Sequence, residues 1–116
     1  MRIKNSKLWL LTQNQGLREL SLSGNEPQRI HHFIKNEREP VKVRLMYIAQ
    51  NKYIWVATQQ GLYVYNPSTG ESKKYIHSEN DEFSIPNNSV WNLDEDKEGN
   101  LWISTFQGGI SYLNFN

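Results

Sequence analysis

The densest run of metal-ligating residue types in the chain lies at residues 94–99, which read Asp-Glu-Asp-Lys-Glu-Gly. This run is similar to the start of a calcium-binding loop. Such a loop needs a bidentate acid six residues after its glycine, and that position holds Thr105. We therefore expect no metal site, and we assign the run to a tight turn. In that turn Asp96 accepts backbone hydrogen bonds and Gly99 has a positive φ.

Residue types that serve in catalysis form no recognisable set. The chain has no cysteine, which excludes disulfides, thiolate metal sites and a cysteine nucleophile. His31 and His32 are neighbours on an expected strand, so their side chains point to opposite faces and do not chelate one ion. No Ser/His/Asp set, glycine-rich phosphate loop or carboxylate pair has a spacing beyond chance. We therefore predict that the chain is not an enzyme and holds no cofactor.

Charge and length limit the classes of partner. The 116 residues carry 13 basic and 12 acidic side chains, for a net charge of +1. Such a balance gives no long-range field, so we expect no nucleic-acid partner and no direct membrane contact. No apolar run approaches the roughly 20 residues of a transmembrane helix. The short apolar stretch at residues 8–11 does not make a signal peptide, so we expect no export signal in this chain.

A short phrase containing tryptophan recurs three times, at residues 8–12, 54–58 and 101–105. Its tryptophans are 46 and 47 residues apart, and self-similarity at that period indicates a repeat architecture. Each phrase ends in threonine and is followed by a polar turn and a glycine. The repeated positions are Trp9, Thr12 and Gly16; Trp55, Thr58 and Gly61; Trp102, Thr105 and Gly109. We interpret the three tryptophans as packing residues between repeats, because they are large, apolar and recurrent.

Each repeat predicts four short antiparallel strands. The phrase itself is rich in β-forming residues and ends at a glycine turn, after which a second strand follows. Third strands are expected at 28–34 and 72–77, and fourth strands at 41–49 and 90–96, after the polar segments 35–40 and 78–89. If the first glycine turn has one residue of slack, His32 aligns with His77 and both face solvent on the outer strand. No stretch has a sustained helical period, so we expect almost no helix.

Four-stranded meanders at this period are typical of β-propeller blades. A β-sandwich is the alternative, but its strands need not resemble one another. We predict an all-β chain of antiparallel four-stranded meander repeats, with a partial blade at 1–34, a full blade at 35–77 and a partial blade at 78–116. The first unit is expected to lack its leading strand and the last its final strand. This gives about ten strands, or two and a half blades, whereas closed propellers have about four or more.

The uncovered terminal blades have a further consequence. We expect the chain to be part of a larger propeller, contacting neighbouring blades, or to self-associate.

The connections of a meander predict where a ligand would bind. Alternate connections lie at the same edge of the sheets, so the turns after the tryptophan strands share an edge with the long loops. Trp91 stands opposite Arg44 in the repeat alignment and could line the central channel. Amides and aromatic rings suit a hydroxyl-rich ligand such as an oligosaccharide, although polar loops are often only solvated. The candidate ligand-binding residues are Gln13, Gln59, Gln60, Trp91, Phe106 and Gln107.

The third repeat, at residues 84–110, resembles the two-component regulator propeller repeat. It has Val90-x-x-Leu93, Asp96, Gly99-Asn100 and the phrase at 101–105 in the order of that repeat, with Ser104 where glycine is usual. The second repeat keeps its tryptophan phrase and residues 61–65 but has Ala49 where the third has Asp96. The first repeat keeps only its tryptophan phrase and Gly16-Leu17.

The resemblance implies a seven-bladed propeller in the periplasmic sensor of a hybrid two-component regulator. In gut Bacteroidetes such sensors respond to breakdown products of complex glycans. The resemblance also implies a membrane span, a histidine kinase and a DNA-binding output, none of which these residues contain. Three alternatives remain: a propeller for protein–protein contact, a propeller lyase or hydrolase, and a truncated reading frame with no independent role.

Overall fold

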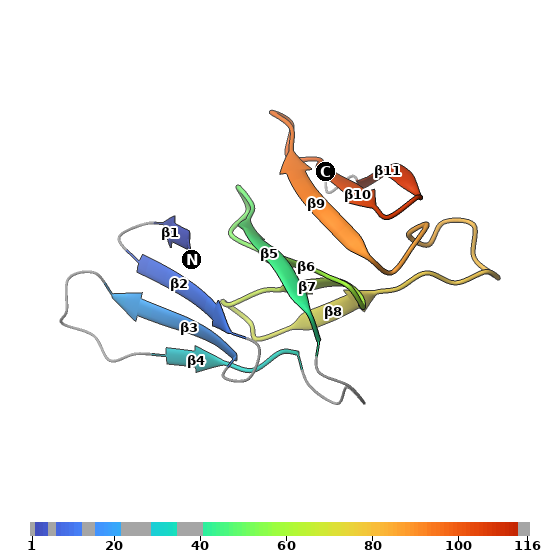
Figure 1. The fold of residues 1–116 in the computed structure, drawn as a ribbon. Helices are drawn as coiled ribbons and strands as arrows, with labels where there is room; N and C mark the ends of the chain where they lie inside the picture. The colour runs from blue at the N-terminus through green and yellow to red at the C-terminus, as the bar shows by residue number, and fades with distance from the viewer. Residues whose placement is uncertain (1, 5–6, 13–15, 22–28, 35–40, 114–116) are drawn as a thin grey trace.

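The computed structural model describes residues 2–4, 7–12, 16–21, 29–34 and 41–113. Within these ranges the chain forms eleven β-strands in three separate antiparallel sheets and no helix (Figure 1). Each sheet pairs its strands in chain order, which makes each one a meander. The predicted all-β architecture of antiparallel meander repeats is therefore confirmed.

The strands have the following bounds. The first sheet contains β1 (Arg2–Lys4), β2 (Lys7–Thr12), β3 (Gly16–Ser21) and β4 (Arg29–His31). The second contains β5 (Val43–Ile48), β6 (Ile54–Thr58), β7 (Gly61–Tyr65) and β8 (Ser72–Tyr75). The third contains β9 (Val90–Glu95), β10 (Leu101–Thr105) and β11 (Gly109–Leu113). The three blade boundaries expected from the sequence stay a prediction.

The start of the chain corrects one expectation. The first sheet does have a leading strand, because β1 pairs with β2 from Arg2 opposite Trp9 to Lys4 opposite Lys7. Three residues suffice for this pairing, since the ladder uses backbone groups that every residue type other than proline supplies in full. The sequence pattern missed the strand because it is too short to show an alternation of apolar and polar residues.

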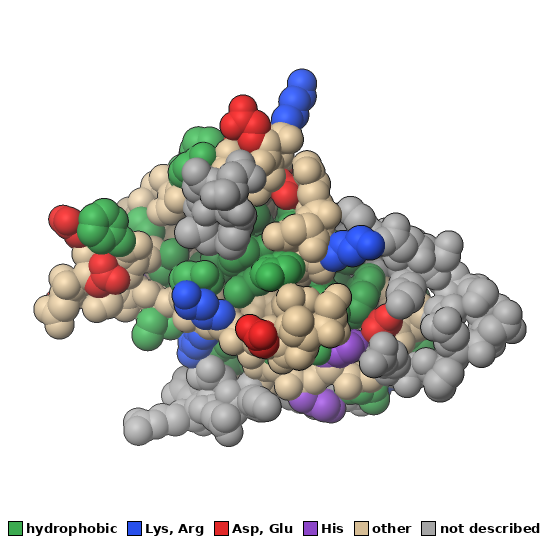
Figure 2. All heavy atoms as spheres, turned by 180° about the vertical axis from the view of Figure 1, so that it is seen from behind, with side chains coloured by type: hydrophobic (Ala, Val, Ile, Leu, Met, Phe, Trp, Pro, Cys, Tyr) green, Lys and Arg blue, Asp and Glu red, His purple; other side chains and the backbone are tan. Residues whose placement is uncertain are grey.

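Two apolar cores join the three sheets, one on each side of the second. The core between the first and second sheets includes Trp9, and the core between the second and third includes Trp55. Every residue of β6 and β7 is buried because both faces of these strands are covered. Figure 2 shows hydrophobic side chains gathered across the middle of the molecule, with charged side chains around them. Trp9 and Trp55 thus lie in the apolar cores between adjacent sheets.

The third sheet has one covered face and one open face. Burial alternates along β9 and β10, with Leu93, Leu101 and Ile103 turned toward the second sheet. Trp102 points the other way and is 41% exposed, whereas Trp55 at the same repeat position is 1% exposed. Within the described part of the chain, the third tryptophan therefore lacks the packing role that the first two have.

The register of the outer strands corrects the alignment of the histidines. His31 lies opposite Leu17 on β3, and Tyr75 lies opposite Leu62 on β7. Because Leu17 and Leu62 are equivalent, His31 is the counterpart of Tyr75, and the expected match of His32 with His77 is wrong by one residue. A slip of one residue exchanges the two faces of a strand. Consequently His31 is half-buried against the second sheet, while His32 is exposed.

The tight turns that follow β5 and β9 have the same backbone form. The amide of Asp96 donates to the carbonyl of Asn100, and the amide of Ala49 donates to the carbonyl of Tyr53. The Asp96 carboxylate also accepts hydrogen bonds from the backbone amides of residues 98 and 100. Gly99 has φ of 85°. The predicted turn roles of Asp96 and Gly99 are therefore confirmed.

Candidate functional site

The turns that follow β6 and β10 dock on two adjacent residues of one loop. The amide of Gly61 donates to the carbonyl of Asn88 at 2.7 Å, and the amide of Phe106 donates to the carbonyl of Ser89 at 2.9 Å. Asn88 and Ser89 end the long loop that leads into β9. The turns of the second and third sheets therefore share one edge with this loop, as the meander connections predict.

An arginine and two aromatic rings meet at this edge. Arg44 on β5 places its guanidinium 4.0 Å from the centre of the Trp91 ring and donates a hydrogen bond from Nη2 to the Ser89 hydroxyl at 3.0 Å. The rings of Trp91 and Phe106 are stacked, with centroids 6.1 Å apart and planes at 26°. Trp91 is 48% exposed and Phe106 is 47% exposed. The edge thus presents aromatic surface beside a fixed cation, and we call these three residues the aromatic–arginine cluster.

The guanidinium of Arg44 does not use all of its hydrogen-bond donors at this cluster. Its Nε atom is buried and has no hydrogen-bond partner among the described residues. The cation over Trp91 also orients the ring, since a guanidinium is attracted to the face of an indole.

The predicted glutamines lie around the same edge. Gln60 accepts a hydrogen bond from the backbone amide of Lys42 at 2.9 Å, which fixes its side chain across the turn. Gln59 is exposed beside it, and Gln107 is exposed in the turn of the third sheet, where its φ is 58°. Gln13 lies outside the described residues. The structure thus brings Trp91 and Phe106 into contact and places Gln59, Gln60 and Gln107 on the two neighbouring turns.

The turn of the third sheet packs closely against the long loop and differs in its hydrogen bonds from the turn of the second. In the second sheet the Thr58 hydroxyl donates to the carbonyl of Gly61 and accepts from the amide of Gln60. The third turn has one more residue, and the buried Thr105 hydroxyl has no partner among the described residues. A Cβ at Gly108 would clash with that hydroxyl and would lie 2.6 Å from Pro86. Glycine is therefore required for the turn to lie against the long loop.

Arg44 and Ser89 are the functional candidates that the sequence interpretation did not select. The sequence contains little sign of them. Arg44 and Trp91 occupy equivalent positions in two repeats, and an alignment of repeats does not indicate that equivalent residues touch each other. The bulge between Val43 and Leu45 breaks the alternation of β5 at this point. Such a bulge redirects a side chain, and no periodic pattern predicts it.

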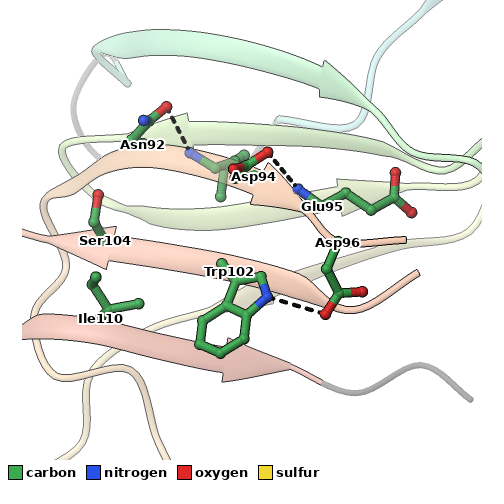
Figure 3. Close-up of a pocket in the computed structure, with 8 residues that line it drawn as sticks. Asn92, Asp94, Glu95, Asp96, Trp102, Ser104 and Ile110 are labelled. Atoms are coloured by element: carbon green, nitrogen blue, oxygen red, sulfur yellow. Dashed lines mark hydrogen bonds between the residues drawn. The ribbon is translucent and has the colours of Figure 1, made fainter. Parts of the chain in front are cut away.

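A hollow lies on the open face of the third sheet (Figure 3). It has a volume of about 460 Å³ and is lined by side chains of β9, β10 and β11, among them Trp102, Ile110 and Asp94. The Trp102 indole donates to the Asp96 carboxylate at 3.2 Å. The backbone amide of Asn100 is the largest of the influences that lower the pKa of Asp96 below its usual value. The described residues contain no group of three or more side chains placed to hold a metal ion.

A buried polar group connects the first and second sheets. His31 lies 3.0 Å from the Glu19 carboxylate through Nε2 and 2.6 Å from the Tyr65 hydroxyl through Nδ1. Glu19 is buried beside Trp9, at a position where the second sheet has Val64. A neutral imidazole satisfies both partners if Nε2 carries the proton. This contact holds two sheets together and lies away from the exposed edge, so we assign it a structural role.

Comparisons with known proteins agree with this geometry. The sequence model of the two component regulator propeller family matches residues 84–107. A search of the curated proteins gave no match. Two solved structures of the extracellular domain of BT4673 from B. thetaiotaomicron are similar to the chain, with 26% identity and a TM-score of 0.74. One is described as a one component system and the other as a hybrid two component system.

The similarity to those structures covers 96% of this chain and 14% of theirs. The chain therefore spans about a seventh of the extracellular domains that it matches. No helix in the described residues is long and apolar enough to cross a membrane. The repeat family and the fold expected from residues 84–110 are confirmed: the chain carries a two component regulator propeller repeat at residues 84–107, in a structure similar to the extracellular domains of such systems.

Proposed function

We propose that this chain is part of the periplasmic sensor propeller of a hybrid two component regulator and takes a non-catalytic part in recognising short oligosaccharides released from glycans. The observation that carries the proposal is the aromatic–arginine cluster of Arg44, Trp91 and Phe106 at the edge where two blade turns meet. The similarity to extracellular domains of sensor systems supports the periplasmic location.

The chemistry of the edge fits a hydroxyl-rich ligand. Aromatic rings offer apolar faces on which a pyranose ring can stack, and glutamine amides both donate and accept hydrogen bonds. Gln59 and Gln107 lie on the two turns at this edge, and both residues are exposed to solvent. The turns are held on a rigid sheet scaffold, as is common for binding residues in loops. Together these groups supply the stacking surface and the polar contacts that a sugar needs.

A protein partner is the second candidate, since tryptophan and arginine are also the residue types that dominate protein interfaces. Thermal shift measurements against a broad panel of oligosaccharides separate the two candidates. A rise in melting temperature with some members of the panel supports sugar sensing. No rise across the whole panel favours a protein partner.

Substitution of the cluster tests the site itself. Trp91→Ala and Phe106→Ala should each weaken binding of an oligosaccharide found by the panel about tenfold, because loss of one aromatic contact is worth roughly 1.4 kcal/mol. Phe83→Ala is the matched control: Phe83 is 90% exposed on the long loop but is no part of the cluster. Calorimetric titration measures all three. Equal weakening by Phe83→Ala, or unchanged binding in both cluster variants, would contradict the proposed site.

A further inference from the structure

The first strands of the second and third sheets, β5 and β9, each contain a bulge at the same place. On β5, Val43 and Leu45 pair with successive residues of β6, so Arg44 between them has no partner in the ladder. On β9, the residues on either side of Trp91 pair with successive residues of β10, which leaves Trp91 unpaired in the same way. The two strands lie side by side (Figure 1). Bulges redirect side chains and are common beside active sites.

The two bulge positions are equivalent in structure but differ in residue type. Each follows a valine, Val43 or Val90, whose partner is the threonine that ends the tryptophan phrase. The strand framework is thus the same in both sheets, while the extra residue is an arginine in one and a tryptophan in the other. A fixed framework that presents different side chains is how a rigid scaffold supplies specificity at a binding site.

Arg44 contacts uncharged groups at this edge. Its guanidinium lies over the ring of Trp91 and donates to the hydroxyl of Ser89. Within the described part of the chain, no acidic side chain forms an ion pair with it. Its Nε is buried, so the cation is only partly solvated. A ligand that covers this cation without offering a negative charge adds to the desolvation cost, whereas an anionic ligand offsets that cost.

Hydrogen-bond donors remain on Arg44 for such a ligand. Nη2 uses one of its two hydrogens on Ser89. The hydrogen bonds within the described residues leave its other hydrogen, and both of those on Nη1, for a ligand. A second cation lies at the same edge, because the backbone of Lys42 bonds to Gln59 and Gln60 and the residue is exposed. The edge therefore offers positive charge together with polar amides.

We propose that Arg44 is the specificity-determining residue of this site and selects an anionic oligosaccharide, whose carboxylate or sulfate group pairs with the guanidinium while its sugar ring lies against Trp91 and Phe106. This inference rests on the proposed function and adds to it the charge of the ligand and the residue that recognises it. Both anionic groups present several oxygens to the planar fork of donors on a guanidinium. Charge-assisted hydrogen bonds of this kind are about twice as strong as neutral ones.

Matched pairs of oligosaccharides that differ only in charge test the inference. Each pair is an acidic oligosaccharide and its neutral form: uronic acid oligomers with their carboxyl-reduced forms in one arm, and sulfated oligosaccharides with their desulfated forms in the other. Calorimetric titration of the full chain should give a Kd about tenfold lower for the charged member of the pairs that bind, the worth of one charge-assisted hydrogen bond. The difference should shrink as salt is added. The arm that binds tells carboxylate from sulfate.

The outcomes separate this inference from the proposed function. Equal binding of the charged and neutral members overturns the inference and leaves the recognition of oligosaccharides intact. The absence of binding by every member of both arms overturns the inference and the proposed function together.

Substitution of Arg44 assigns the preference to this residue. Arg44→Gln should abolish the preference for the charged member and leave the Kd of the neutral member within about twofold, with the fold verified by circular dichroism. Arg44→Lys keeps the charge without the planar fork, so it should retain part of the preference and serves if Arg44→Gln unfolds the chain. Lys97→Gln removes an exposed cation from the turn after β9 and should bind like the wild type. A charge preference that survives Arg44→Gln, or is lost equally in Lys97→Gln, overturns the inference.

Discussion

The second and third sheets use nearly the same tryptophan phrase but bury it differently. In the second sheet every residue of β6 is buried, whereas in β10 Trp102 is exposed and its two neighbours are covered. The backbone register is the same in both, since Trp55 pairs with Tyr47 on β5 and Trp102 pairs with Asp94 on β9. The difference teaches that the phrase specifies the strand and its turn, while burial of the tryptophan depends on the sheet that follows.

The inner strands show that the two faces also differ in chemistry. Leu45 and Tyr47 of β5 pack against the apolar core around Trp55. Their counterparts on β9 are Asn92 and Asp94, both exposed. A cover over the third sheet must therefore meet polar groups toward the inner edge and apolar groups around Trp102.

The largest expected effect is a difference in stability between substitutions of Trp55 and Trp102. Trp55→Ala should lower the free energy of unfolding by about 3–5 kcal/mol, because it opens a cavity in a closed core. Trp102→Ala should lower it by less than about 1 kcal/mol in dilute monomer, since its ring is already partly in water. Urea unfolding of both variants measures the difference. Equal losses would show that the two faces are equally covered in solution.

The contact between the first and second sheets gives the next effect. Glu19→Val introduces the residue of the second sheet at the equivalent position and leaves His31 without its carboxylate, which should cost about 1–3 kcal/mol. Adding His31→Tyr restores the pairing of types found in the second sheet, where Tyr75 stacks on Trp55. The double variant should therefore be more stable than Glu19→Val alone. Additive losses in a double-mutant cycle would contradict the equivalence of His31 and Tyr75.

A smaller effect is expected in the tight turns that follow β5 and β9. Lys52 and Gly99 occupy the same place in these turns, with φ of 72° and 85°. Gly99→Lys should lower stability by about 1 kcal/mol, because a side chain disfavours the left-handed region. Lys52→Gly should change stability little, since the relief of strain is offset by the added freedom of the unfolded chain. Thermal unfolding of the two variants checks this asymmetry.

The smallest expected effect is a pH dependence that the third sheet has and the second lacks. The pKa of Asp96 is lowered in the folded protein, chiefly by the backbone amide of Asn100. A lowered pKa stabilises the fold above the usual value of 3.8, and this contribution is lost as the pH falls through the folded value. Asp96→Asn should remove this part of the acid sensitivity, and Asp94→Asn is the control. Identical acid unfolding curves for the wild type and Asp96→Asn would contradict it.

Much of the fold follows from the repeated phrase, because strand type, meander order and the turn residues Asp96 and Gly99 depend on local sequence. The short strand β1 could not be predicted, since three residues carry no periodicity. The register of the outer strand was wrong because one residue of slack was placed in the first glycine turn, which shifts the alignment of His31 and His32 by one position. At the candidate site, Phe106 was selected from the meander connections and Trp91 from its place in the repeat alignment. The contact of Trp91 with Arg44 depends on a bulge and on sheet-to-sheet packing, which local sequence does not encode.

The contrast between a covered and an open tryptophan face can be measured directly by acrylamide quenching of two single-tryptophan variants. One retains Trp55 and the other Trp102, with the remaining tryptophans replaced by phenylalanine. Trp55 should be protected at every protein concentration. Trp102 should be quenched readily, since its ring is partly exposed. Equal quenching of the two in dilute solution would contradict the account.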